Sequence, residues 1–151
     1  MSRYSVPLTE RQRLRDAWWA ADYRVRLGRR CLQLQPGQPA RAIERLWPGA
    51  SYTWVTGCNP PPGVTSPRAN QAALRALRRD ISAQGWSCRP GEASDGHGQW
   101  REPGWLIRNL SLSQARALAQ RYRQGGVLFW RRRQAVGLQL LWPPLDGEDL
   151  H

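Results

Sequence analysis

Apolar residues at helical spacing open the chain, and a period of two follows them. Residues 10–21 carry an apolar stripe at positions 14, 17, 18 and 21, and Thr9 and Gln12 before it have the spacing of a capping box. From residue 23 to residue 35, apolar and polar residues alternate on either side of a Gly28-Arg29 turn. The pattern predicts a helix over about residues 10–21 and then a β-hairpin whose outer face is rich in arginine.

A wholly buried strand over residues 52–56 is predicted at the centre of the chain. It must stop at Asn59-Pro60, because the prolines that follow supply no backbone N–H for a sheet. Ser66-Pro67 then provides a helix N-cap and a proline at the first helical position, and Gly85 provides a C-cap. Asn70 lies on the apolar stripe of this helix, near its N-terminus and on the inward face.

The second half of the chain predicts further strands and one more long helix. A short strand begins at residues 86–88, residues 90–99 form a loop, and residues 105–107 form a strand. Ser111 and Gln114 make a capping box for a helix that ends at Gly125-Gly126, and residues 127–142 form a terminal hairpin. With a short helix over residues 40–47, this order predicts an α+β fold: a mixed, mostly antiparallel sheet with three to four helices packed on it in a two-layer sandwich.

Length and composition fit one folded domain. A chain of 151 residues with 40% hydrophobic residues and nine tryptophans has enough apolar area for a core. We expect residues 1–142 to form the domain, in which residues 1–50 supply the first helix, the hairpin and the short helix. Residues 143–151 are expected to be a flexible acidic tail, since they hold three of the 11 acidic residues.

The net charge of +12 favours an anionic partner. Every one of the 23 basic residues is arginine, which contacts phosphate through two nitrogens and stacks on bases. The residues proposed to bind nucleic acid lie in the first hairpin and in the turn of the last one, and are Arg24, Arg26, Arg29, Arg30, Arg131, Arg132 and Arg133. A solvated basic surface without a specific partner explains the same charge.

Cysteine and histidine usage indicates no metal site. The three cysteines are far apart and lack paired spacing, so reduced thiols, mostly buried, are expected instead of disulfides or a zinc site. His97 stands alone in a predicted loop, and no cofactor motif is present. Because no signal-peptide pattern opens the chain and no apolar run is long enough to span a membrane, we expect a cytoplasmic protein.

Four short motifs together resemble the bacterial domain-of-unknown-function family 3293. They are Thr56-Gly57-Cys58-Asn59-Pro60, then Asn70, then residues 98–106 (GQWREPGWL), then Arg121-Tyr122-Arg123-Gln124 before an apolar strand. The resemblance covers about residues 51–142 and implies a small cytoplasmic bacterial domain without an established reaction. This chain departs from the family in having Gly125-Gly126 where members have Asn-Ala, so a ligand contact made by that asparagine would be lost here.

Six side chains at strand ends and loops are candidates for one shared cleft. They are Asn59, Asn70, Asp95, Trp100, Glu102 and Gln124. Glu102 lies among tryptophans, so its pKa could be raised for acid or base work with Asp95 as an ionised partner. The alternatives are structural: Glu102 forms an ion pair with an arginine, and Asn70 fixes the Asn59 turn.

Three classes of function follow from these features. The leading hypothesis is a non-catalytic module that binds RNA or a ribonucleoprotein through the arginines. The second is a small-molecule enzyme in which Glu102 and Asp95 do acid–base work and Asn59, Asn70 and Gln124 orient the substrate. The third is a protein-interaction adaptor whose acidic tail masks the basic body. The sequence leans against an enzyme, and it leaves the oligomeric state open.

Overall fold

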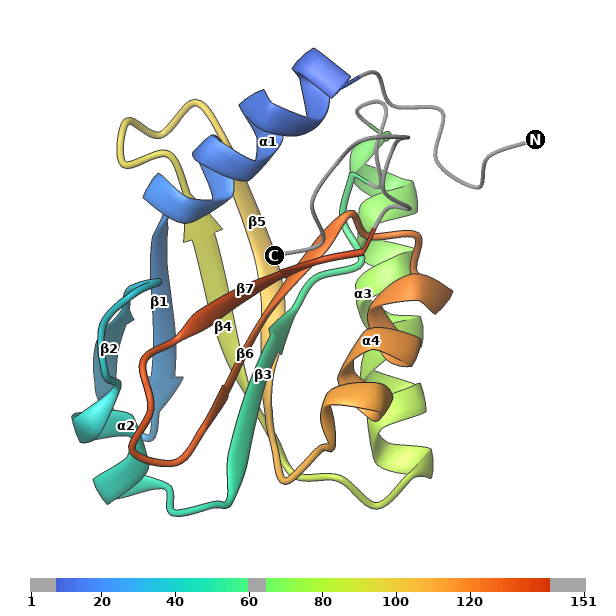
Figure 1. Ribbon diagram of the computed structural model, residues 1–151. Coiled ribbons are helices and arrows are strands. Elements are labelled where there is room, and N and C mark those ends of the chain that lie inside the picture. Colours follow the sequence, from blue (N-terminus) through green and yellow to red (C-terminus); the bar gives the residue numbers. More distant parts are fainter. Residues whose placement is uncertain (1–7, 60–64, 142–151) are drawn as a thin grey trace.

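Seven antiparallel strands and four helices make up the computed structural model, which describes residues 8–59 and 65–141 (Figure 1). The helices are α1 (Leu8–Ala20), α2 (Arg41–Leu46), α3 (Pro67–Ala83) and α4 (Leu112–Arg121). The strands are β1 (Asp22–Leu27), β2 (Arg30–Leu34), β3 (Ser51–Val55), β4 (Cys88–Ser94), β5 (Arg101–Arg108), β6 (Gly126–Arg131) and β7 (Gly137–Leu140). They pair in the order β2-β1-β4-β5-β3-β6-β7.

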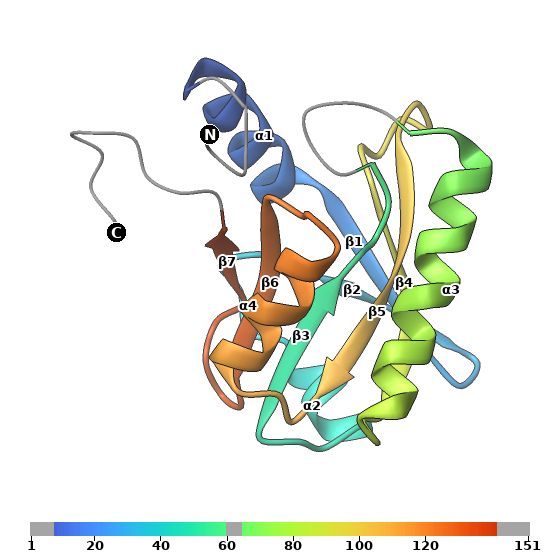
Figure 2. The same ribbon diagram turned by 90° about the vertical axis from the view of Figure 1, so that its right-hand side faces the viewer.

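The sheet curls into a half-barrel (Figures 1 and 2). The segment after β2 meets the segment before β7: Gly37 N–H donates to Val136 O at 2.8 Å, and Val136 N–H donates to Gln38 O at 3.0 Å. Pro39 and Ala135 form an antiparallel bridge at the same place. The two edges of the sheet therefore come together at the end where α2 lies, and in the described part of the chain they stay apart at the other end, beneath α1.

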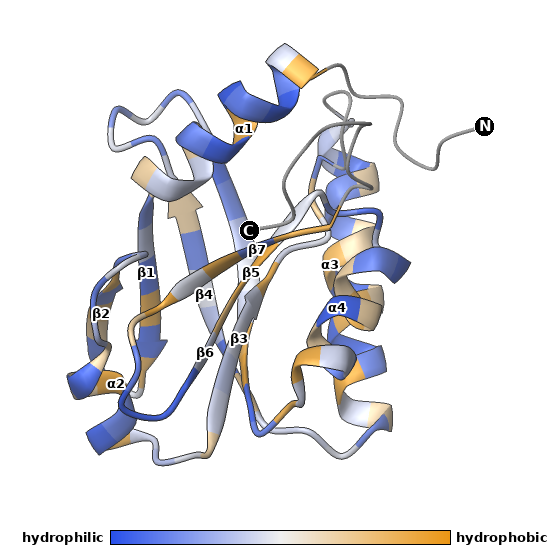
Figure 3. Cartoon of the chain, viewed as in Figure 1, coloured by the Kyte–Doolittle hydropathy of each residue, from blue (hydrophilic) through white to orange (hydrophobic). Residues whose placement is uncertain are grey.

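The inner face of the half-barrel is filled by alternate residues of the strands. On β1, Tyr23, Val25 and Leu27 point inward and the arginines between them are exposed, an alternation visible as bands in Figure 3. Tyr52 stacks on Trp130 with ring centroids 5.0 Å apart. Ile43 and Trp47 of the α2 segment close one end of this core.

Trp54 occupies the inner face because two glycines make room for its indole. Gly91 and Gly104 lie directly opposite each other on β4 and β5. A Cβ at Gly104 would lie 2.7 Å from Cζ2 of Trp54, and a Cβ at Gly91 would lie 2.8 Å from its Nε1. Both distances are shorter than real Cβ contacts, so the Trp54 indole can take this position only because residues 91 and 104 are glycines.

The outer face carries a second core beneath α3 and α4 (Figure 2). Leu77 and Ile81 of α3 and Ala115 of α4 are fully buried against Val55 and Ile107 of the sheet. Ser66 caps α3 by accepting from Ala69 N–H, and Ser111 with Gln114 forms the capping box of α4. The outer face of β2, β1 and the neighbouring part of β4 has no helix over it (Figure 2).

The predicted α+β class is confirmed, with all pairings antiparallel and the sheet curled. Several predicted boundaries differ from the structure, and two of them are wrong by several residues. Residues 90–94 belong to β4 instead of a loop, and α4 ends at Arg121, because Arg123 takes a left-handed φ of 59° before Gly125-Gly126 is reached. The acidic tail predicted over residues 143–151 lies outside the described residues, as do the prolines at 60–62. Among the described helices, none has the length and apolarity of a membrane span.

The glycine slot for Trp54 gives a stability prediction. We expect Gly104→Ala to lower the free energy of unfolding by about 2–3 kcal/mol, since the added methyl meets both Trp54 and the Val55 carbonyl. Gly98→Ala is the matched control, because Gly98 has open space and a φ of +81°, so its cost is about 1 kcal/mol of backbone strain. Urea unfolding of both variants measures this, and an equal loss would contradict the slot.

Candidate functional site

A cleft of about 730 Å³ lies between α1 and the open end of the half-barrel. One wall is the face of α1 that includes Leu14, Ala17 and Trp18. The opposite wall is the β4–β5 hairpin, and Asn59 and Gln124 complete the lining. The apolar stripe predicted for the first helix is thus only partly buried: Leu14 and Trp18 are half-buried and Ala17 is exposed.

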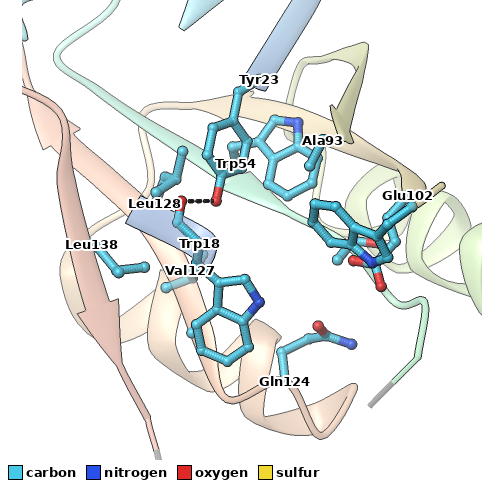
Figure 4. A pocket seen from close by; sticks show the side chains of 12 residues that line it. Trp18, Tyr23, Trp54, Ala93, Glu102, Gln124, Val127, Leu128 and Leu138 are labelled. Atoms are coloured by element: carbon cyan, nitrogen blue, oxygen red, sulfur yellow. Dashed lines mark hydrogen bonds between the residues drawn. The ribbon is translucent and has the colours of Figure 1, made fainter. Parts of the chain in front are cut away.

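A small cavity of about 30 Å³ continues from the cleft into the inner core. Figure 4 shows the rings of Trp18, Tyr23 and Trp54 around it, with the Glu102 carboxylate and the Gln124 amide at one side. The Tyr23 hydroxyl donates to the backbone carbonyl of Trp18 at 2.7 Å, which ties α1 to β1. A cavity of this size has room for a water molecule, so a polar group of a ligand also fits.

The turn after β3 places Asn59 at the cleft. The Thr56 hydroxyl donates to Pro103 O at 2.8 Å and accepts from Cys58 N–H at 3.0 Å, so the end of β3 is fixed to β5. Asn59 then takes a left-handed φ of 46°, a conformation that asparagine adopts more readily than most residues. In this conformation the Asn59 side chain points toward Glu102 on β5.

Asn59 and Asn70 bind each other reciprocally. Asn59 N–H donates to Asn70 Oδ1 at 2.9 Å, and Asn70 Nδ2 donates to Asn59 Oδ1 at 2.9 Å. Thr65 N–H also donates to Asn59 Oδ1 at 3.1 Å, which anchors the start of the α3 segment to the same turn. Asn70 therefore fixes the Asn59 turn, as the structural alternative expects, and leaves Asn59 Nδ2 to act on another group.

That group is Glu102, whose Oε1 accepts from Asn59 Nδ2 at 2.9 Å. Glu102 is 7% exposed, and burial raises the pKa of its carboxyl, opposed by hydrogen bonds from the Asn59 and Trp100 side chains. The alternative in which an arginine pairs with Glu102 is wrong within residues 8–59 and 65–141, where no arginine forms an ion pair with it. A buried carboxyl with neutral partners retains acceptor capacity for a ligand.

Asp95 lines the same cleft, and its side chain also forms a hydrogen bond within its own loop. Its Oδ1 accepts from His97 N–H at 2.8 Å, and this bond is the main cause that lowers the pKa of the carboxyl. Asp95 N–H donates to Trp100 O at 3.2 Å, which closes the β4–β5 hairpin. The structure brings Asp95 and Glu102 to one cleft without a direct bond between them, and their pKa values are shifted in opposite directions.

Gln124 is buried and connects the end of α4 to the β3 turn. Its Nε2 donates to Cys58 O at 3.2 Å and to Tyr122 O at 3.3 Å. Cys58 itself is buried, and burial raises the pKa of its thiol, which disfavours the thiolate needed for a nucleophile. The expectation of mostly buried thiols fails at Cys31, which is exposed on the outer face of the β1–β2 hairpin.

The seven predicted arginines do not form one surface. Those of the β1–β2 hairpin and those of the β6–β7 turn lie on opposite sides of the molecule in Figure 2, with α2 between them. Arg24 pairs with Asp22 at 3.1 Å, and no other member of the seven pairs with an acidic residue of the described chain. The β6–β7 turn is bonded to α2 through Arg133 N–H and Glu44 Oε1 at 2.7 Å.

Sequence reasoning predicted Trp100 at the site but missed the other aromatic residues around it. Trp18, Tyr23 and Trp54 are assigned to the core by their periodicity, and the sequence carries no signal that their rings border a cavity beside Glu102. His97 is exposed as expected, and no group of three potential metal ligands occurs among the residues that the structure describes. The lining of the cleft and cavity thus combines predicted polar residues and Trp100 with aromatic residues predicted only as core.

Fold and site define a small α+β domain with a ligand-sized cleft at the open end of a curled sheet. Residues 55–127 match the model of the family described as "Protein of unknown function (DUF3293)", so this part of the chain is similar to that family. The match confirms the resemblance over a shorter range than the predicted 51–142, and it includes Asn59, Asn70, Glu102 and Gln124. No curated protein and no solved structure matches the chain.

The raised pKa of Glu102 gives a prediction of stability against pH. The folded state holds this proton to higher pH than the unfolded chain, so the resulting stabilisation is complete below the ordinary pKa of 4.5 and is lost as pH rises through the folded-state pKa. Glu102→Gln removes this dependence. We therefore expect the melting temperature of Glu102→Gln, relative to that of the wild type, to rise as the pH is raised from about 4 to about 7.

The control for this experiment is Glu92→Gln on the exposed outer face of β4. Glu92 pairs with Arg101 at 3.3 Å, so this variant should show no such gain. A melting temperature of Glu102→Gln that falls behind the wild type as pH rises would contradict the desolvation account, because that sign belongs to a carboxylate stabilised by a cation.

Proposed function

We propose that the protein binds a small organic molecule in the cleft beneath α1, and that Glu102 is the group that contacts the polar part of this molecule. The single observation that carries the proposal is the position of Glu102. Its carboxyl is buried, has neutral hydrogen-bond partners, and borders both the 730 Å³ cleft and the cavity behind it. An apolar pocket with a few convergent polar groups and a perturbed carboxyl is the common form of a small-molecule site.

The polar residues around Glu102 support a preorganised site. Asn59 is held by Asn70 and Thr65, so its bond to Glu102 keeps the carboxylate in one orientation before a ligand arrives. Trp18 and Trp100 border both spaces, and each offers a flat apolar surface to a ligand. In this proposal Asn59 positions Glu102, and Asn70 positions Asn59 and makes no ligand contact of its own.

Acid–base chemistry is compatible with the same geometry. A carboxyl with a raised pKa beside one with a lowered pKa is the arrangement that separates a proton carrier from a permanently charged group. Glu102 would take a proton from the bound molecule, or return one, at the inner end of the cleft. Asp95 would remain ionised at the hairpin.

A library of metabolites tests the binding site directly. Ligand-observed NMR should find a binder whose affinity falls at least about tenfold in Trp100→Ala, the loss expected for an aromatic anchor. Trp19→Ala is the matched control, because Trp19 is 51% exposed on α1, packs over Gly37 and does not line the cleft. A binder affected equally by both variants would place binding elsewhere, and the absence of any binder would overturn the proposal.

A second candidate, binding of RNA or a ribonucleoprotein, is favoured by the arginines at the α2 end. Arg41 and Arg45 of α2 are exposed, and so are Arg131, Arg132 and Arg133 of the turn that is bonded to α2. These five positive charges lie at one end of the molecule, whereas Arg24 in the other hairpin already has a carboxylate partner. Phosphate-backbone binding depends on such local charge.

Two triple variants of equal charge separate a site from a merely basic surface. For a short single-stranded RNA, the logarithm of the affinity falls as the logarithm of the salt concentration rises. Replacing residues 131–133 with glutamine should make this slope less steep by about 2, or about 0.7 per lost contact. Replacing Arg26, Arg29 and Arg30 with glutamine should change that slope by less than about 1. Fluorescence anisotropy measures both, and equal changes would mean that the charge acts diffusely and that this candidate is wrong.

A further inference from the structure

The cleft beneath α1 differs in charge from the rest of the molecule. Among the described residues, its charged lining consists of Glu10, Arg13, Asp95, Arg101 and Glu102. The two cations already have partners, since Arg13 pairs with Glu10, and Arg101 pairs with a glutamate on the outer face of β4 at 3.3 Å. Within the described chain, Asp95 and Glu102 have no ionic partner. The cleft of a protein with a net charge of +12 thus presents unpaired negative charge.

Aromatic rings stand beside this negative charge. Trp18 and Trp100 line the cleft together with Glu102, and Tyr23 and Trp54 line the cavity behind it (Figure 4). The faces of tryptophan and tyrosine rings attract cations electrostatically, most strongly in a desolvated site. A carboxylate among such rings therefore favours a positively charged group and disfavours an anion.

Resting on the proposed function, we infer that the molecule bound in this cleft is an organic cation, with an amine or amidine group on an apolar or aromatic body. The nitrogen donates to Glu102 at the inner end, and the body lies against the α1 wall formed by Leu14, Ala17 and Trp18. Asp95 at the hairpin adds a second negative charge along the path into the cleft. Phosphorylated and carboxylated molecules are disfavoured, because they would meet both carboxylates, and the two arginines of the described lining already pair with glutamates.

Three probes of one shape and different charge test this inference. Benzamidine is a cation, benzamide is its neutral counterpart, and benzoate is an anion. Titration into the ¹⁵N-labelled full chain, followed through the tryptophan indole signals, should give benzamidine an affinity at least about tenfold higher than that of benzamide, with benzoate weakest. Trp18→Phe and Trp100→Phe identify which indole signals report on the cleft.

Two variants of equal charge locate the effect. Glu102→Gln should lower the affinity for benzamidine to about that of the wild type for benzamide. Asp16→Asn is the control, because Asp16 is exposed on α1 outside the cleft lining, so it should change neither affinity by more than about twofold. An equal loss in both variants would indicate net charge instead of a contact with Glu102, and would overturn the inference.

The remaining outcomes separate this inference from the proposed function. If benzamide or benzoate binds in the cleft as tightly as benzamidine, selection for a cation is wrong, while the cleft as a small-molecule site stands. If none of the three binds at millimolar concentration but a metabolite from the library loses affinity in Trp100→Ala, the inference fails alone. If neither experiment finds a binder, both fail.

Discussion

The hydrogen bond from Asn59 to Glu102 is the interaction on which the site depends. It joins the turn after the central strand to the strand that carries the buried carboxyl. Asn70 and Thr65 hold that turn from the α3 segment, and Gln124 holds it from the end of α4 through the Cys58 carbonyl. Segments that are distant in sequence thus converge on one short turn, and any change in it displaces the only buried carboxyl of the described core.

The curl of the sheet explains why the cleft with Glu102 and the arginine-rich α2 end lie at different ends of the molecule. Because the edges meet at the α2 end, that end is filled by Ile43 and Trp47, and the guanidinium groups of Arg89 and Arg108 lie 5.0 and 4.7 Å from the Trp47 ring centroid. Within residues 8–59 and 65–141, the helix that covers the other end is α1, and the cleft lies beneath it. An acidic, aromatic cleft and an arginine-rich end can therefore coexist in a molecule whose net charge would otherwise repel a cation.

Patterns within single elements were readable from the sequence, whereas contacts between elements were not. The alternation after residue 22 predicts the hairpin, and the stripe through Asn70 places that side chain below the Asn59 turn. The loop predicted after residue 90 is wrong because Pro90 and Gly91 look like turn residues, yet Gly91 is needed by Trp54, which lies far away in sequence. The aromatic border of the cavity was unreadable for the same reason: core tryptophans and ligand-facing tryptophans have the same spacing.

The bridge between Pro39 and Ala135 also bears on self-association. An open seven-stranded sheet has two edge strands, and unpaired edges invite strands of other molecules to add on. Here the residues after β2 and before β7 use their backbone groups on each other, and Pro39 itself has no N–H to offer. At this end the curled sheet therefore protects its own edges against edge-to-edge aggregation, a role that other proteins give to an additional helix or loop.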